Sequence, residues 1–361
     1  MMRNIFYTPG PSQLYFTVEQ HMQEALRTGV ASISHRSKGY IAMQQFTEET
    51  LRTLLNVPSD YHIGFVSSAT EIWERAIENL VNKKSYHFVN GSFSEKFYSV
   101  AQELGKDAIA AIAEPGTNHD ITAANIPDDV ELITLAQNET STGAWIPVEA
   151  IDTLRSQYPD VLIAIDGVSS LPVANINVSS TDMLYFSVQK CFGLPSGLGV
   201  WIYNDRCLRK AEELKAKGQY HDTYNGILSV HKFGQKHQTS CTPNVLNIFL
   251  LGKVAADMLA KGMDKIRNET IYKSTLIYNL FEQHEMLSPF VKKKKYRSQT
   301  VGVAEVKGGT DDLLGQLAEK GLVVGGGYSQ FKGQHIRIAN FPTHSKEQME
   351  MLVDTINSLY F

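Results

Sequence analysis

The sequence predicts an α/β protein built on a mainly parallel sheet, with a smaller α+β domain towards its C-terminal end. Three observations support this fold class. Short apolar runs alternate with helical patterns over the first 255 of the 361 residues, the order typical of βαβ units. Most of these runs are nearly continuous in Val, Ile, Leu and Phe, as in strands that helices cover on both faces. After about residue 255 the alternation stops.

Six apolar runs are the predicted strands of the large sheet. In chain order they are His62–Val66, Tyr86–Val89, Glu131–Leu135, Val161–Ile165, Met183–Val188 and Gly199–Tyr203. Apolar residues at helical spacing predict helices between them, at Glu71–Val81, Ser94–Leu104 and Val148–Tyr158. Strands that are separated by helices in this way pair in parallel, because a parallel pair needs a long crossover connection.

The C-terminal part of the chain lacks the alternation of strand and helix patterns. A helical stretch runs from Val245 towards Thr275, and a polar, Lys-rich segment with a few short strands follows. The chain closes with a predicted helix that opens on a capping box of Ser345 and Gln348. Helical spacing is kept by Met349, Leu352, Val353, Ile356, Leu359 and Tyr360. We predict a large α/β domain over residues 16–255 and a small α+β domain made of residues 1–15 and 256–361.

Composition narrows the class of function. Hydrophobic residues make up 43% of the chain and charged residues 20%, values of a globular protein and not of a disordered chain or a coiled-coil rod. The net charge of −4 offers no basic excess for binding nucleic acid. No apolar run approaches the ~20 residues of a membrane span. Three scattered cysteines favour neither a disulfide framework nor a metal site. We therefore expect a cytoplasmic enzyme without a metal, a membrane or a nucleic acid as partner.

Polar and aromatic side chains follow five of the predicted strands. Ligands of open parallel sheets bind beyond the carboxyl ends of the strands, so these residues share one rim. The rim consists of Ser67–Thr70, Asn90–Phe93, Ala136–Thr140, Asp166–Gly167 and Gln189–Lys190. Taken alone, each has an ordinary explanation: Asp166 as a turn residue, Lys190 as a surface lysine and Phe93 as a core residue.

Together these residue types match what pyridoxal phosphate requires. A helix N-terminus attracts the phosphate, a lysine forms a Schiff base, and an aromatic ring stacks on the pyridine. A carboxylate keeps the ring nitrogen protonated. Motifs of competing cofactors are absent: Gly193, Gly197 and Gly199 lack GxGxxG spacing, no P-loop occurs, and His284-Glu285 does not extend to HExxH.

With these residues in place, the sequence resembles the class V, fold-type I pyridoxal-phosphate aminotransferases, and among them the phosphoserine aminotransferases most closely. The matching stretches keep the family's order along most of the chain: Tyr7–Pro11, Ile33–Ser37, Ser68–Thr70, Asn138–Gly143, Asp166–Ser170, Gln189–Leu198, Thr242–Asn244 and Gly333–Asn340. The resemblance implies a mainly parallel sheet of the seven-stranded type between helices. It also implies a homodimer with shared active sites, and amino-acid and 2-oxo-acid substrates.

The resemblance further implies a role for each matching residue. Lys190 is the catalytic lysine that carries the cofactor, Asp166 pairs with the cofactor's ring nitrogen, and Phe93 stacks on the ring. Arg337 binds the α-carboxylate of the substrate, and His35 and Arg36 bind its distal anion at the subunit interface. Further cofactor contacts come from Ser68, Ala69, Thr70, Asn138, Thr140, Ser169, Gln189 and, across the subunit interface, Thr242.

Three departures from the family pattern bear on the cofactor or the substrate. Phe93 replaces the usual stacking tryptophan, and Cys241 replaces the asparagine of an Asn-Thr-Pro stretch. The family's His-Arg pair before the C-terminal glycines has no counterpart among residues 330–332. Because that pair helps to hold the substrate phosphate in the family, Lys332 or His335 is the candidate replacement.

The leading expectation is amino transfer between glutamate and 3-phosphohydroxypyruvate, a step of serine synthesis. An alanine–glyoxylate or serine–pyruvate type enzyme of the same class is the first alternative. A Schiff-base lyase that uses Lys190 without a cofactor and a non-catalytic scaffold of the same fold also stay open. A cysteine desulfurase is not expected, since it needs a nucleophilic cysteine in the small domain and none follows Cys241.

Overall fold

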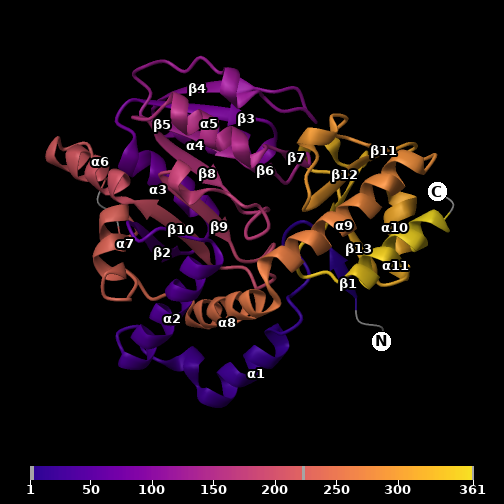
Figure 1. The fold of residues 1–361 in the computed structure, drawn as a ribbon, viewed down its shortest axis with the longest axis horizontal. Helices are drawn as coiled ribbons and strands as arrows, with labels where there is room; N and C mark the ends of the chain where they lie inside the picture. Colours follow the sequence, from indigo (N-terminus) through magenta and orange to yellow (C-terminus); the bar gives the residue numbers. More distant parts are fainter. Residues whose placement is uncertain (1–3, 222–223, 360–361) are drawn as a thin grey trace.

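The computed structural model describes residues 4–221 and 224–359, which form two main β-sheets (Figure 1). The larger sheet has seven strands and lies among helices. The smaller sheet has five strands and lies beside it; four of them belong to the orange-to-yellow C-terminal part of the chain, and β1 is the indigo N-terminal strand. The predicted α/β class, with a large sheet between helices and a smaller C-terminal α+β part, is confirmed.

The large sheet has the strand order β2-β10-β9-β8-β5-β3-β4. Its strands are β2 (Tyr61–Val66), β3 (Lys84–Val89), β4 (Asp107–Ile112), β5 (Leu132–Ala136), β8 (Leu162–Asp166), β9 (Met183–Ser187) and β10 (Gly199–Asn204). In this sheet β10 runs antiparallel to both β9 and β2, and the other neighbouring pairs are parallel. All six predicted strands are therefore present in a mainly parallel sheet.

The edge strand β4 is not among the six strands predicted from the sequence. Its sequence, DAIAAI, is rich in alanine, and its residues are exposed or only partly buried. An edge strand has a neighbour on one side alone, so it needs less apolar surface than a central strand. The continuous apolar run that marks the central strands is consequently absent from β4.

Alternate residues of the strands point to opposite faces of the large sheet, and each face packs on its own helices. In β5, for example, Ile133 belongs to one core and Leu132 to the other. One face packs on α1 (Val18–Thr28), α2 (Lys38–Leu54), α5 (Val148–Gln157) and α8 (Val245–Lys261). The other packs on α3 (Ala69–Leu80), α4 (Ser92–Glu103), α6 (Asp205–Ala216) and α7 (Ile227–Gly234). The central strands are therefore apolar on both faces, which is why they read as continuous apolar runs.

The small sheet has the order β1-β13-β14-β12-β11, so both ends of the chain meet in it. Its strands are β1 (Ile5–Tyr7), β11 (Leu287–Pro289), β12 (Val301–Val306), β13 (Leu322–Gly326) and β14 (His335–Ala339). Its core is shared with α9 (Met263–Gln283), α10 (Asp311–Glu319) and α11 (Lys346–Asn357). The predicted boundary at residue 255 falls inside α8, and the division into two domains stays a prediction.

Two predicted helices differ in detail from the observed ones. The stretch from Val245 towards Thr275 is two helices, α8 and α9, because the chain turns at Gly262 with φ 88°. The capping box of Ser345 and Gln348 is present at the start of α11. That helix ends at Asn357, and Tyr360 lies outside the described residues. In the part of the chain that the structure describes, no helix is long and apolar enough to cross a membrane.

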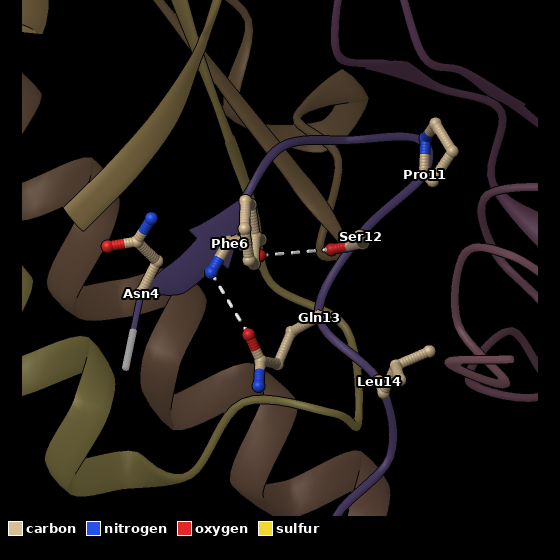
Figure 2. Close-up of a pocket in the computed structure, with 6 residues that line it drawn as sticks. All are labelled: Asn4, Phe6, Pro11, Ser12, Gln13 and Leu14. Carbon is tan, nitrogen blue, oxygen red and sulfur yellow. Dashed lines mark hydrogen bonds between the residues drawn. The ribbon is translucent and has the colours of Figure 1, made fainter. Parts of the chain in front are cut away.

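The N-terminal segment joins the small sheet to the rim of the large one. After β1 the chain bends back, and the side chain of Gln13 accepts a hydrogen bond from the Phe6 N–H (3.0 Å; Figure 2). The Ser12 hydroxyl donates to the Phe6 carbonyl (3.3 Å), and the Ser12 N–H donates to the Gln189 carbonyl (3.1 Å). Residues 8–14 therefore lie directly against the segment that carries Lys190.

Candidate active site

A cavity opens at the carboxyl ends of β5, β8 and β9, at the position that parallel sheets use for ligands. About 430 Å³ of its space is free of protein atoms, and part of this space is open to solvent. It is lined by Ala69, Thr70, Trp73, Phe93, Ala136, Asn138, Thr140, Asp166, Val168, Ser187, Gln189 and Lys190. The structure therefore brings together most of the side chains that the sequence places at one rim.

Lys190 follows β9, and its side chain is buried. Its Nζ donates to Thr140 Oγ1 (2.8 Å) and lies 4.9 Å from the centre of the Phe93 ring. Burial lowers the pKa of the Lys190 ammonium to about 8, although the charges of Asp166 and Glu139 oppose the shift. A buried amine that gives up its proton this readily can act as a nucleophile near neutral pH.

Asp166 is the last residue of β8, on the strand beside the one that leads to Lys190. Its Oδ1 accepts a hydrogen bond from the Val168 N–H (2.8 Å). Burial raises the pKa of the Asp166 carboxyl to about 6, and this hydrogen bond and the Lys190 charge act in the opposite direction. A carboxylate in such dry surroundings gains most from a cationic partner in direct contact.

A buried carboxylate, Glu139, fixes the position of Phe93. Glu139 lies in the short hairpin of β6 (Asn138–Glu139) and β7 (Ala144–Trp145), and its oxygens accept from the N–H groups of Phe93 and Ser94 at the start of α4. A negative charge at a helix N-terminus is favourable, because the free N–H groups there carry partial positive charge. No role was predicted for Glu139, because the sequence around it does not show that it caps a helix whose residue Ser94 lies 45 positions away.

The start of α3 contributes a second side of the cavity. Ser68 is the N-cap residue, and its hydroxyl accepts from the Glu71 N–H (3.1 Å). The Ala69 N–H donates to Ser187 Oγ (2.7 Å). The Ser68 hydroxyl thus caps the helix, whereas Thr70 lines the cavity.

Ser169 supports the cavity from behind. Its hydroxyl accepts from Thr140 Oγ1 (2.9 Å) and from Asn138 Nδ2 (2.8 Å), and it donates to the Asn138 carbonyl (3.0 Å). The Ser169 carbonyl accepts from Thr300 Oγ1 (2.6 Å), directly before β12. Ser169 does not line the cavity, but it holds two residues that do.

Arg337 enters from β14 of the small sheet. Its Nε donates to the Gly326 carbonyl (2.7 Å) and its Nη1 to the Thr140 carbonyl (3.5 Å). Its guanidinium carbon lies 5.2 Å from the centre of the Tyr328 ring. Burial lowers the pKa of Arg337 to about 10, so the side chain stays positively charged at neutral pH. A fixed, charged guanidinium thus stands beside Thr140, next to Lys190.

Six predicted site residues are absent from the lining of the cavity. Ser68, Ser169 and Arg337 adjoin or hydrogen-bond residues that line it, whereas His35, Arg36 and Thr242 do not reach it within one chain. Arg36 is exposed, donates to Gln238 Oε1 (2.7 Å) and stacks over the Phe233 ring (4.6 Å). Thr242 is also exposed, in the loop before α8. Their roles stay predictions that depend on a second subunit.

His335, suggested as a replacement phosphate donor, is wrongly placed for that role. Its ring is buried and stacks on Phe331 (4.5 Å between ring centres) and lies against Phe290 (4.3 Å). These three rings border a different hollow, which Lys190 and Asp166 do not line. His335 and Arg337 are two residues apart on β14 and leave the sheet on the same face, but packing on Phe290 and Phe331 holds the His335 ring away from the cavity.

Comparison with known proteins identifies the family. The family model named Aminotransferase class-V matches residues 5–351. The chain belongs to the class-V aminotransferases. It is similar to a phosphoserine aminotransferase of known structure from Cytophaga hutchinsonii, with 46% identity, a TM-score of 0.97 and 100% of both chains covered. It is also 29% identical to the phosphoserine aminotransferase of Rhodococcus opacus, over 96% of this chain and 93% of the relative.

A more distant protein of known structure shares the fold alone. The alanine–glyoxylate aminotransferase from Nostoc sp. is 21% identical, with a TM-score of 0.84, 99% of this chain and 95% of that chain covered. For a class-V aminotransferase the substrates are an amino acid and a 2-oxo acid, and the family implies pyridoxal phosphate as cofactor. The fold-type I architecture expected from the sequence is thereby confirmed.

Gly10 of the N-terminal segment packs against the side chain of Lys190. A Cβ atom built on Gly10 would lie 2.8 Å from Lys190 Cε, and φ of Gly10 is 145°. Gly29, which ends α1, also has a positive φ (69°), but nothing lies within 4 Å of its Cβ position. An alanine would be strained at either position, but only at Gly10 would its methyl group also contact Lys190. Gly29 is therefore the control for strain without that contact.

We expect Gly10→Ala to impair the reaction of Lys190 with pyridoxal phosphate by about tenfold or more, because the new methyl group displaces the amine. Gly29→Ala should lower the free energy of unfolding by about 1 kcal/mol and leave that reaction unchanged. The visible absorption of the bound cofactor, followed after mixing, measures the reaction. Equal rates in Gly10→Ala and Gly29→Ala would show that the segment does not position Lys190.

Proposed function

We propose that this class-V aminotransferase uses pyridoxal phosphate to exchange an amino group between glutamate and 3-phosphohydroxypyruvate, with O-phosphoserine as product. The observation that carries the proposal is the cavity in which the Lys190 amine and the Asp166 carboxylate lie at the ends of neighbouring strands. The similarity to relatives named phosphoserine aminotransferase supports the choice of substrate.

The residues of the cavity fit the cofactor. Lys190 supplies a buried amine, Asp166 a carboxylate and Phe93 an aromatic ring. Trp73, which also lines the cavity, has a buried Nε1–H that finds no acceptor among the described residues. We assign Lys190 to the covalent link, Asp166 to the ring nitrogen and Phe93 to the ring face. Ala69, Thr70, Asn138, Thr140 and Gln189 would complete the contacts.

The residues of this chain then divide the work of amino transfer. When bound, the cofactor supplies an electron sink for the negative charge that develops at the substrate Cα. Lys190 removes the proton from Cα and returns it one position away, a task for which a pKa near the working pH is best suited. Thr140 Oγ1 orients the amine, and Asp166 stabilises positive charge at the ring nitrogen.

Arg337 is assigned to the α-carboxylate of the substrate. Its Nε and Nη1 are held by the carbonyls of Gly326 and Thr140, which leaves Nη2 free to donate from a fixed position. A planar guanidinium held in this way restricts how the substrate can lie, and so selects which bond at Cα breaks.

Lys96 is our candidate for the distal phosphate group, in place of the family's missing His-Arg pair. It lies one turn after Phe93 on α4; its Nζ is 5.4 Å from the centre of the Phe93 ring and 5.0 Å from that of Tyr328. It donates to the Tyr328 hydroxyl (2.7 Å) and is exposed, with no carboxylate partner among the described residues. Because Tyr328 also borders Arg337, Lys96 lies on the same side of the cavity as the carboxylate-binding arginine.

Three predicted residues, of which Arg36 and Thr242 are exposed and His35 is half-buried, support a shared active site in a homodimer. His35, Arg36 and Thr242 present polar groups outside the cavity of their own chain. We propose that they reach the cavity of a second subunit, with Thr242 near the cofactor phosphate and His35 and Arg36 near the distal group of the substrate.

Lys96→Gln should separate the two class-V activities. We expect a ten- to hundredfold loss in kcat/KM for phosphoserine, the cost of one charge-assisted contact, and little change for alanine. Lys320→Gln, at the exposed lysine directly after α10, is the control and should change neither. Single-turnover spectra with phosphoserine, serine, alanine and glutamate measure the activity of each variant with each amino acid. Preference of the wild type for alanine, or equal losses on both substrates, would favour the alanine–glyoxylate alternative.

Subunit mixing tests the shared site. Lys190→Ala and Arg36→Ala should each be inactive with phosphoserine as homodimers. If Arg36 acts across the interface, each mixed dimer has one intact site, and random mixing restores roughly a quarter of the wild-type activity. If Arg36 acts in its own subunit, no intact site forms. A mixture that stays inactive after subunit exchange, verified by size and tag analysis, would contradict the shared site.

A further inference from the structure

Two buried hydrogen-bond donors near Asp166 have no acceptor in full hydrogen-bond geometry. Trp73 Nε1 and Tyr185 Oη are both buried and make no such bond with a described residue. Both are nevertheless close enough to Asp166 that Trp73 lowers the pKa of Asp166 and Asp166 raises the pKa of Tyr185. A buried donor without a partner costs free energy, so such groups are rare in native proteins. Their side chains otherwise belong to the apolar core between the large sheet and α3, where their polar atoms are unnecessary.

The sheet register places Tyr185 beside Asp166. Asp166 of β8 and Tyr185 of β9 are direct partners across the parallel pair, so their side chains leave the sheet on the same face. Trp73 comes from α3, which packs on this face, and lines the same cavity as Asp166. Asp166 Oδ1 accepts a hydrogen bond from the Val168 N–H, and no hydrogen bond of normal geometry reaches Oδ2 from the described residues, although Trp73 lies close enough to lower the pKa of Asp166. The Trp73 Nε1–H and the Tyr185 hydroxyl thus lie near Asp166 Oδ2, an oxygen that can accept further hydrogen bonds.

We propose that Tyr185 and Trp73 are positioning residues that hold the Asp166 carboxylate by hydrogen bonds and aim it at the ring nitrogen of the cofactor. The proposal extends the proposed function, on which the cofactor part of it rests. A carboxylate oxygen accepts more than one hydrogen bond, so these donors leave room for the ring nitrogen.

The physical need for such donors follows from the burial of Asp166. Burial favours its protonated form, and donors to the charged form favour ionisation. The other charged groups that act on Asp166 are Lys190, which favours ionisation, and Glu139, which opposes it. Once Lys190 is linked to the cofactor, its charge is no longer fixed, and neutral donors become the stable support of the carboxylate.

Trp201 provides a matched control. It is the direct partner of Tyr185 on β10, points to the same face, and its buried Nε1 also lacks an acceptor. It is one strand farther from Asp166. If the polar atoms of this layer were only tolerated in the core, removing any one of them would have the same kind of effect.

The experiment compares Tyr185→Phe, Trp73→Phe and Trp201→Phe in the holoenzyme. We expect the first two to weaken pyridoxal phosphate binding about tenfold and to move the pH midpoint of its visible band upward. The shift is upward because loss of positive charge at the ring nitrogen favours the proton on the nitrogen that joins Lys190 to the cofactor. Trp201→Phe should leave the affinity and the midpoint unchanged. If Tyr185→Phe and Trp73→Phe behave like Trp201→Phe, the proposal is overturned.

A second measurement does not depend on the cofactor. In the cofactor-free protein at pH 8, the effect of Tyr185→Phe on unfolding should change when Asp166→Asn is already present, whereas the effect of Trp201→Phe should not. Additivity of Tyr185→Phe and Asp166→Asn would overturn the proposal. A wild type that shows no visible band with pyridoxal phosphate would instead contradict the proposed function, and the unfolding cycle would still decide on the contact with Asp166.

Discussion

The site depends on the burial of two groups that water would prefer to keep charged, the Asp166 carboxyl and the Lys190 amine, at the ends of neighbouring strands. Loss of water is the largest cause of both shifts: it raises the pKa of Asp166 to about 6 and lowers that of Lys190 to about 8. The burial of these two groups is therefore electrostatically costly, and a ligand that offers a cation to Asp166 and a carbonyl carbon to Lys190 relieves both costs. The apolar layers on both faces of the large sheet maintain this burial.

The same cavity joins the two sheets. Thr300, before β12, donates to the Ser169 carbonyl, and Asn138 Nδ2 donates to Thr300 Oγ1 (3.1 Å). Arg337 reaches from β14 to the carbonyl of Thr140, and the N-terminal segment lies against Lys190. The orientation of Lys190 through Thr140 therefore depends on residues of both sheets, which is consistent with an active site at their junction.

The sequence alone could predict what depends on local pattern. The central strands and the residues that follow them were predictable, because apolar runs and strand ends are local features. Partnerships between distant residues were not: Lys96 and Tyr328 are 232 residues apart, and Glu139 caps a helix that precedes it. In the sequence Tyr185 and Trp73 look like ordinary core residues; the strand register places Tyr185 beside Asp166, and the packing of α3 brings Trp73 to the same cavity. His35, Arg36 and Thr242 cannot be placed in a site by a single chain.

The central claim is that Lys190 forms the covalent link to pyridoxal phosphate, and borohydride reduction tests it most directly. Reduction of the holoenzyme, digestion and mass spectrometry should locate the reduced pyridoxyl group on Lys190. Lys273 is the informative competitor, since burial lowers its pKa to about 7. Its Nζ, however, is held by the carbonyls of Phe341 (3.0 Å) and His344 (2.8 Å). A label on Lys273, or spread over exposed lysines without Lys190, would contradict the account.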